Sequence, residues 1–284
     1  MGKLFGSSGV RGLANVDLTP LLACKVGLAV SAYAKAHRAI VARDTRVSGS
    51  MIEDALVSSL MASGADVYLA DVVPTPVLAY ATKALGADVG FMITASHNPP
   101  QYNGIKVFNK ESLSYTDQDQ AAVEKNVAES RFALADWRKL GKTVNVDAEA
   151  LYFEMALKAV CLKKPWRVVV DPGCGATYNV APALLKALGC KVTALNAQPD
   201  GYFPARSSEP TAGSLKDLAN VVRVLGADVG VAFDGDGDRV AFVDEKGVFV
   251  NFDRSLAAYA AYVLRRSGGG TVAAILTSRD SPSR

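Results

Sequence analysis

The chain has 284 residues, of which 50% are hydrophobic and 21% are charged, a composition typical of globular proteins with a sizeable core. Its 31 basic and 28 acidic residues give a net charge of +3 at pH 7, which is too balanced for a nucleic acid or a membrane to be the main partner. The length predicts about two domains.

Cysteine usage and the N-terminus predict a soluble protein of the cytoplasm. The cysteines lie far apart and form no C-x-x-C pair, which favours reduced thiols. The N-terminus has no apolar region typical of a signal peptide, and the most apolar run, residues 21–36, contains two lysines and is too short to span a bilayer. With only two histidines, His37 and His97, a histidine-rich metal site is excluded. The cysteines are Cys24, Cys161, Cys174 and Cys190.

Helical and strand patterns alternate through the first half of the chain. Thr19 and Pro20 predict a helix start, with the threonine as N-cap and the proline in the first turn. Two later helices are expected to end at Gly64 and Gly86. The alternation predicts a mostly parallel sheet covered by helices. The expected helices are 20–36, 50–63 and 77–85, and the expected strands are 39–42, 67–69 and 89–93.

The second half shows the same alternation, which indicates a repeat. Leu-Gly-Ala-Asp-Val-Gly occurs at residues 85–90 and again at 225–230, and a Pro-Thr pair precedes the helix both times, at 74–75 and 210–211. We interpret this as two copies of one α/β unit, with an independent turn of coincidental sequence as the alternative. The expected elements here are strands 167–170, 192–195 and 229–233 and helices 179–188 and 214–225.

The last strand of each copy leads into an unusual polar loop. The first loop is T-A-S-H-N-P-P at residues 94–100, and the second is D-G-D-G-D-R at residues 234–239. Ligands of open α/β sheets bind beyond the carboxyl ends of parallel strands. Two copies that face one another would therefore bring both loops to one cleft.

The three aspartates of the second loop indicate a cation site. In an extended strand the outer pair would lie about 13 Å apart, too far for one ion. Gly235 and Gly237 let the backbone curl so that Asp234, Asp236 and Asp238 converge, and such oxygen ligands suit Mg²⁺ or Ca²⁺. An EF-hand would need glycine where Arg239 stands, and a solvated acidic turn is the remaining alternative.

Two further residues carry chemistry only if their surroundings support it. Ser96 follows a buried strand and lies beside His97, so it is a candidate nucleophile, but a capping or turn serine fits the same pattern. Arg11 lies among glycines at residues 5–12, where exposed backbone N–H groups and a guanidinium could bind phosphate. A flexible leader is the alternative, and the stretch lacks the Lys-Ser/Thr end of a nucleotide-binding P-loop.

Together these residues resemble the α-D-phosphohexomutase family. The resemblance rests on the glycine-rich start with Arg11, the R-D-T-R turn at 43–46, the T-A-S-H-N-P-P-x-x-N-G-x-K run that ends at Lys106, and the D-G-D-G-D-R loop. Their order and spacing fit the family up to about Asp253. The resemblance implies repeated α/β domains with mixed sheets and transfer of a phosphoryl group between C6 and C1 of a hexose phosphate. The hexose would be glucosamine, mannose or glucose.

The resemblance also implies the reaction route and the metal. A phosphoserine at Ser96 would exchange its phosphoryl group with the sugar through a hexose 1,6-bisphosphate, which also activates the serine. Asp234, Asp236 and Asp238 would bind Mg²⁺, with a phosphoserine oxygen as a further ligand. The implied partner is a small sugar phosphate.

Four more residues receive roles by resemblance. Arg239 would steady the transferring phosphate, and Arg11 would contact phosphate in the active site. Lys106 and His97 would take part in proton transfer near the sugar hydroxyl. Since a lysine must be neutral to accept a proton, we expect nearby cations to lower the pKa of Lys106.

The end of the chain departs from the family. Members have four domains, and neither the G-E-x-S-G-H sugar loop of the third nor the phosphate clamp of the fourth is found. We therefore expect domain I at 1–147, domain II at 148–247 and an incomplete start of domain III at 248–284, with a helix at 253–266 and a strand at 271–276. Exposed apolar residues there, such as Leu256 and Val263, predict local disorder or self-association. Two alternatives to a mutase are a catalytically silent remnant that binds Mg²⁺ and phosphosugar, and a phosphatase.

Overall fold

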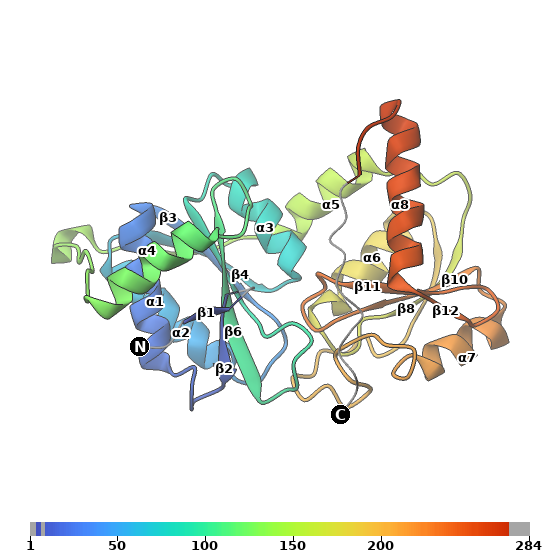
Figure 1. The fold of residues 1–284 in the computed structure, drawn as a ribbon, viewed down its shortest axis with the longest axis horizontal. Helices are drawn as coiled ribbons and strands as arrows, with labels where there is room; N and C mark the ends of the chain where they lie inside the picture. The colour runs from blue at the N-terminus through green and yellow to red at the C-terminus, as the bar shows by residue number, and fades with distance from the viewer. Residues whose placement is uncertain (1–3, 7–8, 273–284) are drawn as a thin grey trace. The chain divides into compact units, whose positions relative to one another are not determined.

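The computed structural model describes residues 4–6 and 9–272 and forms two compact units, residues 1–249 and residues 250–284. The first unit contains two α/β halves, each a sheet with its own helices, one built from the blue to green part of the chain and one from the yellow to orange part (Figure 1). None of the helices in the described ranges is long and apolar enough to cross a bilayer.

A seven-stranded mixed sheet organises the first half, with strand order β1-β2-β6-β5-β3-β4-β7. The strands β5, β3, β4 and β7 run parallel, whereas β6 pairs with β5 in the antiparallel direction. The bounds are β1 Phe5–Gly6, β2 Gly9–Leu13, β3 Arg38–Arg43, β4 Asp66–Val72, β5 Val89–Ile93, β6 Tyr102–Asn109 and β7 Thr143–Asn145.

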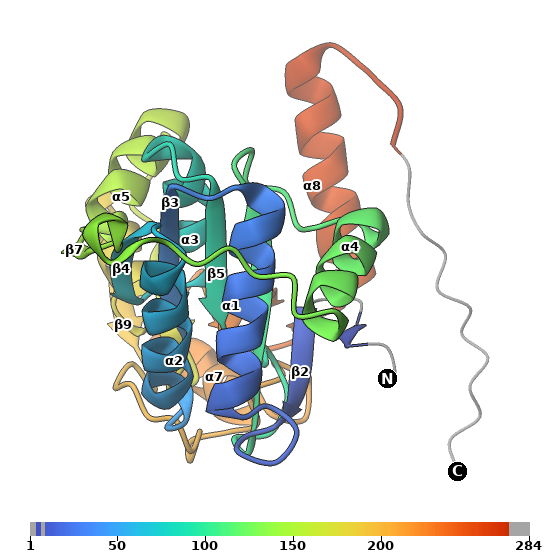
Figure 2. The same cartoon turned by 90° about the vertical axis from the view of Figure 1, so that its left-hand side faces the viewer.

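Helices cover both faces of this sheet. Successive residues of a strand point to opposite faces, so Val41 packs with α1, α2 and α4, while its neighbour Ile40 packs with α3. Both faces are buried, which explains why the central strands are continuous apolar runs. Figure 2 shows α1 and α2 side by side over the sheet. The helices are α1 Pro20–Ala34, α2 Gly49–Ala62, α3 Thr75–Ala84, α4 Asp117–Ala128 and α5 Ala148–Ala159, with a 3₁₀ turn at Trp137–Lys139.

The second half is built on a five-stranded sheet of order β12-β11-β10-β8-β9. Here β9, β8 and β10 run parallel, and β11 pairs antiparallel with β10. The elements are β8 Arg167–Asp171, the 3₁₀ turn Ala176–Tyr178, α6 Val180–Ala187, β9 Lys191–Ala194, α7 Lys216–Leu225, β10 Val229–Phe233, β11 Val240–Val243 and β12 Phe249–Val250.

The repeat predicted from the sequence is confirmed by the topology. The strand order β4-β3-β5-β6 of the first sheet corresponds to β9-β8-β10-β11 of the second, with the same directions. The repeated hexapeptide makes the same contacts in both copies. Gly86 and Gly226 have φ angles of 62° and 56°, the left-handed backbone conformation with which many α-helices end. Asp88 and Asp228 then accept hydrogen bonds from the backbone at the start of the neighbouring strand.

The predicted helices and strands of the repeat are present to within a few residues at their ends, but several elements were missed. The polar helix α4 has only Gln120, Val123 and Val127 buried, so its apolar pattern is weak. Helix α5 begins at the residue after Asp147, which is its N-cap. The missed strands β6 and β11 each follow one of the polar loops and return antiparallel beside the strand that delivers it.

The second unit contains α8, Phe252–Ser267, which confirms the predicted helix. None of its residues is buried, and Leu256 and Val263 are 61% and 41% exposed. The predicted strand 271–276 lies mostly outside the described residues.

Candidate active site

The first polar loop, here called the serine loop (residues 94–100), follows the carboxyl end of β5 and holds Ser96 in a rare backbone conformation. Ser96 has φ of 54° and is only 2% exposed. Its N–H donates to Thr94 Oγ1 at 2.8 Å. A non-glycine residue in the left-handed region is strained and persists only where the surroundings hold it, which is common at functional sites.

A buried arginine holds the serine loop. Arg46, at the carboxyl end of β3, pairs with Asp44 at 2.9 Å, and both side chains are fully buried. Asp44 also accepts a hydrogen bond from Thr94 Oγ1 at 2.6 Å. The guanidinium of Arg46 donates to the backbone oxygens of Ser96, Asn98, Pro99 and Tyr102 at 2.7–2.9 Å. This one side chain therefore fixes the path of the loop that carries the candidate nucleophile.

The second polar loop, here called the aspartate loop (residues 234–239), follows β10 and is curled as predicted. One carboxylate oxygen from each of Asp234, Asp236 and Asp238 lies within 4.8 Å of the others. Gly237 has φ of 71°, which lets the chain curl. Gly235 is required for a different reason, because a Cβ there would lie 2.5 Å from the backbone oxygen of Ser96.

The two loops meet, as the facing arrangement of the repeats predicts. The Ser96 hydroxyl donates to Asp234 Oδ2 at 2.7 Å and lies 3.3 Å from His97 Nδ1. Lys106, on β6, extends to the same place, and its Nζ lies 2.6 Å from Asp236 and 2.5 Å from Asp238. The candidate nucleophile, a basic side chain and three carboxylates therefore occupy one site.

Burial and crowding shift the protonation of this cluster. Burial, followed by repulsion from the other two aspartates, raises the pKa of Asp234 to about 8. Burial also opposes the charged form of Asp236, but the ammonium group of Lys106 outweighs it and lowers the pKa of that carboxyl group. In the same way burial opposes the charge on Lys106, but Asp236 and Asp238 outweigh it and raise the lysine pKa. The expected lowering of the Lys106 pKa is therefore wrong for this arrangement, because carboxylates and not cations surround its Nζ.

The cluster fits a hard divalent cation. Asp236 Oδ1 is buried and has no hydrogen-bond partner among the described residues, although a buried carboxylate oxygen is costly when it is unpaired. A cation would satisfy this oxygen and offset the repulsion among the three carboxylates. All-oxygen ligation of this kind suits Mg²⁺ or Ca²⁺ and not a soft metal.

Cationic side chains lie beside the loop junction. Arg239 Nη1 contacts both oxygens of Glu209, at 2.9 and 2.8 Å. Burial and the charge of Arg239 lower the pKa of His97, so its imidazole is neutral at pH 7. Arg11, on β2, also acts to lower the pKa of His97, and its own Nε is buried without a hydrogen-bond partner among the described residues. The structure thus places all eight residues singled out from the sequence in or beside one site.

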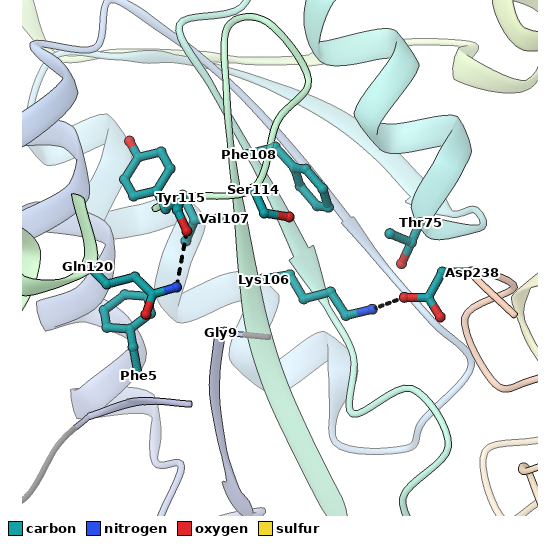
Figure 3. A pocket seen from close by; sticks show the side chains of 10 residues that line it. All are labelled: Phe5, Gly9, Thr75, Lys106, Val107, Phe108, Ser114, Tyr115, Gln120 and Asp238. Atoms are coloured by element: carbon teal, nitrogen blue, oxygen red, sulfur yellow. Dashed lines mark hydrogen bonds and ion pairs between the residues drawn. The ribbon is translucent and has the colours of Figure 1, made fainter. Parts of the chain in front are cut away.

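A pocket of about 270 Å³ opens beside Lys106 and Asp238 (Figure 3). Phe5, Phe108 and Tyr115 line its apolar side. Of the cluster, Lys106 and Asp238 line the pocket, so a small molecule in it would contact these two side chains.

Several residues that shape the site carried no role in the sequence analysis. Arg46 was part of the R-D-T-R turn, but its contacts could not be foreseen. Thr75 donates to Asp236 Oδ2 at 2.5 Å, and Ser208 donates to the backbone oxygen of His97 at 2.7 Å. The available signal for Thr75 and Ser208 was their place near the Pro-Thr pairs, directly after Pro74 and two residues before Pro210.

The chain is similar to known proteins over most of its length. Residues 2–134 match the family model of phosphoglucomutase/phosphomannomutase alpha/beta/alpha domain I, and residues 150–247 match that of domain II. A probable phosphoglucosamine mutase of Pyrococcus abyssi is 43% identical over 96% of this chain and 60% of its own length. A phosphoglucomutase/phosphomannomutase of Thermococcus kodakarensis is 44% identical over 98% of this chain and 63% of its own length.

A solved structure shows the same fold. The crystal structure of a phosphoglucomutase/phosphomannomutase family protein from Burkholderia thailandensis superposes with a TM-score of 0.85 at 33% identity. The match covers 93% of this chain and 59% of that protein. This chain thus spans about 60% of the length of the relatives that it matches. From the two family models and these likenesses, the chain belongs to the α-D-phosphohexomutase family.

Proposed function

We propose that this chain carries the phosphoserine and Mg²⁺ part of a phosphohexomutase. Such an enzyme transfers a phosphoryl group between C6 and C1 of a hexose phosphate through a hexose 1,6-bisphosphate. The observation that carries the proposal is the 2.7 Å contact between the Ser96 hydroxyl and Asp234, which are 138 residues apart in the chain. The substrate class is a glucosamine, mannose or glucose phosphate, and neither nucleic acid nor membrane is a partner.

We also propose a division into domains and a location in the cytoplasm. Domain I comprises residues 1–147 and domain II residues 148–247, and residues 248–284 belong to a third domain. The four cysteines all lie among the described residues and are unpaired, which fits the reducing cytoplasm.

The transfer step exchanges one P–O bond for another. The phosphoryl group leaves the Ser96 oxygen as a sugar oxygen attacks, and the return transfer from the bisphosphate restores the phosphoserine. Uncatalysed phosphate-monoester hydrolysis can be slower than the enzymatic reaction by up to ~10²¹-fold, so positioning and charge must supply the acceleration. The positive charge comes from Arg11, Arg239 and Lys106, which would face the three equatorial oxygens of the phosphoryl group in transit.

Side chains beside Ser96 handle the protons. His97 is neutral, and its Nδ1 lies 3.3 Å from Ser96 Oγ, so it accepts the serine proton when the serine is phosphorylated. Lys106 is charged beside its carboxylate partners, so it donates a proton to the sugar oxygen that departs when Ser96 is phosphorylated. In the opposite transfer the lysine, now neutral, takes the proton of the attacking sugar hydroxyl, and His97 returns its proton to the Ser96 oxygen.

Asp234, Asp236 and Asp238 would hold Mg²⁺, with an oxygen on Ser96 as a further ligand. When bound, the ion would supply positive charge to the transferring phosphoryl group. The orphaned Asp236 Oδ1 supports this assignment.

The proposal is tested by phosphorus NMR of the whole chain with Mg²⁺ and a trace of glucose 1,6-bisphosphate. Glucose, mannose and glucosamine 1-phosphates are supplied in turn, beside a Ser96→Ala control. A 6-phosphate that forms only with the serine present supports the mutase. Release of inorganic phosphate without isomerised sugar would indicate a phosphatase instead, and binding without any turnover would indicate a silent phosphosugar-binding protein.

A further inference from the structure

Each half of the first unit sends one segment to the polar loop of the other half. In the first half the segment is residues 73–76, which follow β4 and include the first two residues of α3, and in the second it is residues 206–211, between β9 and α7. Both segments contain the repeated Pro-Thr pair, and both precede the helix that ends in the repeated hexapeptide. The segments therefore occupy equivalent places in the two copies.

The first segment orients a carboxylate of the aspartate loop. The Thr75 hydroxyl donates to Asp236 Oδ2 at 2.5 Å, and the Thr75 N–H donates to the Asp236 backbone oxygen at 2.9 Å. This N–H is available because Thr75 is the first residue of α3, where backbone donors lack partners within the helix. Both residues are at least 95% buried. With Oδ2 held by Thr75 and Lys106, the other oxygen, Oδ1, is left for a cation.

The second segment holds the serine loop and its neighbouring arginine. Ser208, which is 4% exposed, donates to the backbone oxygens of His97 and Asn98 at 2.7 and 3.2 Å. The next residue, Glu209, accepts from Arg239 through both carboxylate oxygens and lies 3.6 Å from His97 Nδ1. This segment thus touches the serine loop of the first half and the end of the aspartate loop.

We infer that the two segments are positioning elements that the halves exchange: Thr75 fixes the metal-binding carboxylate, and Ser208 fixes the serine loop. Glu209 also lies beside His97 of that loop and holds Arg239 of its own half next to it. What the loops do rests on the proposed function, but the exchange itself rests on the contacts. These residues act through their partners and are not catalytic. The consequence is that each loop depends on the half that does not contain it.

The chain offers a matched control. Thr211 occupies the place of Thr75 in the second Pro-Thr pair, but its hydroxyl pairs with Ser214, three residues later in the same half. Replacing Thr211 with valine therefore removes a hydroxyl from the equivalent position without touching either loop.

Hydrogen–deuterium exchange of the whole chain tests, without reference to activity, whether each segment stabilises the polar loop of the other half. Thr75→Val, which keeps the side-chain shape, should speed exchange in residues 234–239 about fivefold, as the loss of one net hydrogen bond predicts, and leave residues 94–100 unchanged. Ser208→Ala should speed exchange in residues 94–100 and leave residues 234–239 unchanged. Thr75→Ser should restore slow exchange, and Thr211→Val should affect neither loop. Equal exchange in wild type and Thr75→Val, or a change spread evenly over both loops, would overturn the inference.

Metal affinity and phosphoryl transfer separate this inference from the proposed function. By calorimetry Thr75→Val should weaken Mg²⁺ binding about 10–100-fold, as residues that orient metal ligands do, whereas Thr75→Ser should stay close to wild type. Glu209→Gln should slow phosphorylation of Ser96 by glucose 1,6-bisphosphate about tenfold with Mg²⁺ affinity unchanged, and Glu111→Gln, in an exposed pair with Lys83, should not. A wild-type chain that binds Mg²⁺ but accepts no phosphate would refute the proposed function alone. Wild-type Mg²⁺ affinity in Thr75→Val would refute the positioning role alone.

Discussion

Replacing Arg46 with methionine should remove the support of the serine loop. Methionine is of similar length but carries no donor, so Asp44, which is 0% exposed, loses its charge partner and keeps only the hydrogen bonds from Thr94 and the backbone. Breaking a buried ion pair in this way costs about 3–5 kcal/mol. Four backbone oxygens also lose their donor, at roughly 1 kcal/mol each where water does not replace it. The expected loss is about 5 kcal/mol or more, a large share of the 5–15 kcal/mol that is typical of folded proteins.

The matched control is Arg43→Met, three residues earlier on the same strand end. Arg43 pairs with Glu53 and Asp71, and the three side chains are 24%, 14% and 78% exposed, so solvent screens both pairs more than it screens the fully buried pair of Arg46 and Asp44. Such pairs contribute about 0–1 kcal/mol. Arg46→Lys, which keeps the charge and loses the forked geometry, should fall between the two methionine variants.

Urea unfolding followed by circular dichroism measures the free energy of unfolding of the wild type and the three variants. The expected order is wild type, Arg43→Met, Arg46→Lys and Arg46→Met, from most to least stable. If Arg46→Met lost no more than about 1 kcal/mol, the same as the control, the buried arginine would not be the support of the loop.

Three other predictions concern the same site. Gly235→Ala should lower the free energy of unfolding by about 1–3 kcal/mol, because its Cβ would lie 2.5 Å from a backbone oxygen of the serine loop. In the control Gly213→Ala the nearest atom to the new Cβ is 3.9 Å away, so the free energy of unfolding should change by less than ~0.5 kcal/mol. Equal effects of the two substitutions would refute the close approach. Burial and Arg239 lower the pKa of His97, so the midpoint of its NMR titration should lie below 6.5. The stability contributed by the neutral ring is then present above pH 6.5 and is lost as the pH falls from 6.5 toward the lower pKa of the folded state. A midpoint above 6.5 would contradict this. Mg²⁺ at 100 times its dissociation constant should raise the free energy of unfolding by about 2.7 kcal/mol, and Asp236→Asn should abolish most of that gain; identical melting curves in Mg²⁺ and in chelator would rule out the metal site.

The repeated fold could be predicted because its signals are local. The hexapeptide ends a helix with a glycine in the left-handed region and starts a strand three residues later, and Asp88 and Asp228 cap the start of the neighbouring strand. The helix end and the strand start depend only on neighbouring residues, whereas the contacts of Asp88 and Asp228 reach 50 and 61 residues back along the chain and were not predicted. The two polar loops could also be placed, since both follow a strand of the same type in the same copy of the repeat.

The support of the site could not be predicted because its contacts are long-range. Thr75 and Asp236 are 161 residues apart, and Arg46 contacts backbone oxygens that lie at least 50 residues away. A threonine beside a proline and an arginine in a turn have many ordinary roles, and only the folded chain shows which groups they meet.

The charge state of Lys106 illustrates the same limit. A cationic surrounding and a lowered pKa were expected from the mechanism that the resemblance implies. In the structure the lysine lies between Asp236 and Asp238, at 2.6 and 2.5 Å, and its pKa is raised. The sign of the shift depends on which charges surround the Nζ atom, and the sequence does not contain that information.

The most direct test of the central claim is the intact mass of the purified chain after incubation with glucose 1,6-bisphosphate and Mg²⁺, beside Ser96→Ala. The account predicts one added phosphoryl group in the wild type, located on Ser96, and none in the variant. A wild-type chain that remains unmodified while it binds Mg²⁺, or an adduct that persists in Ser96→Ala, would contradict the claim that these two loops form a phosphoryl-transfer site.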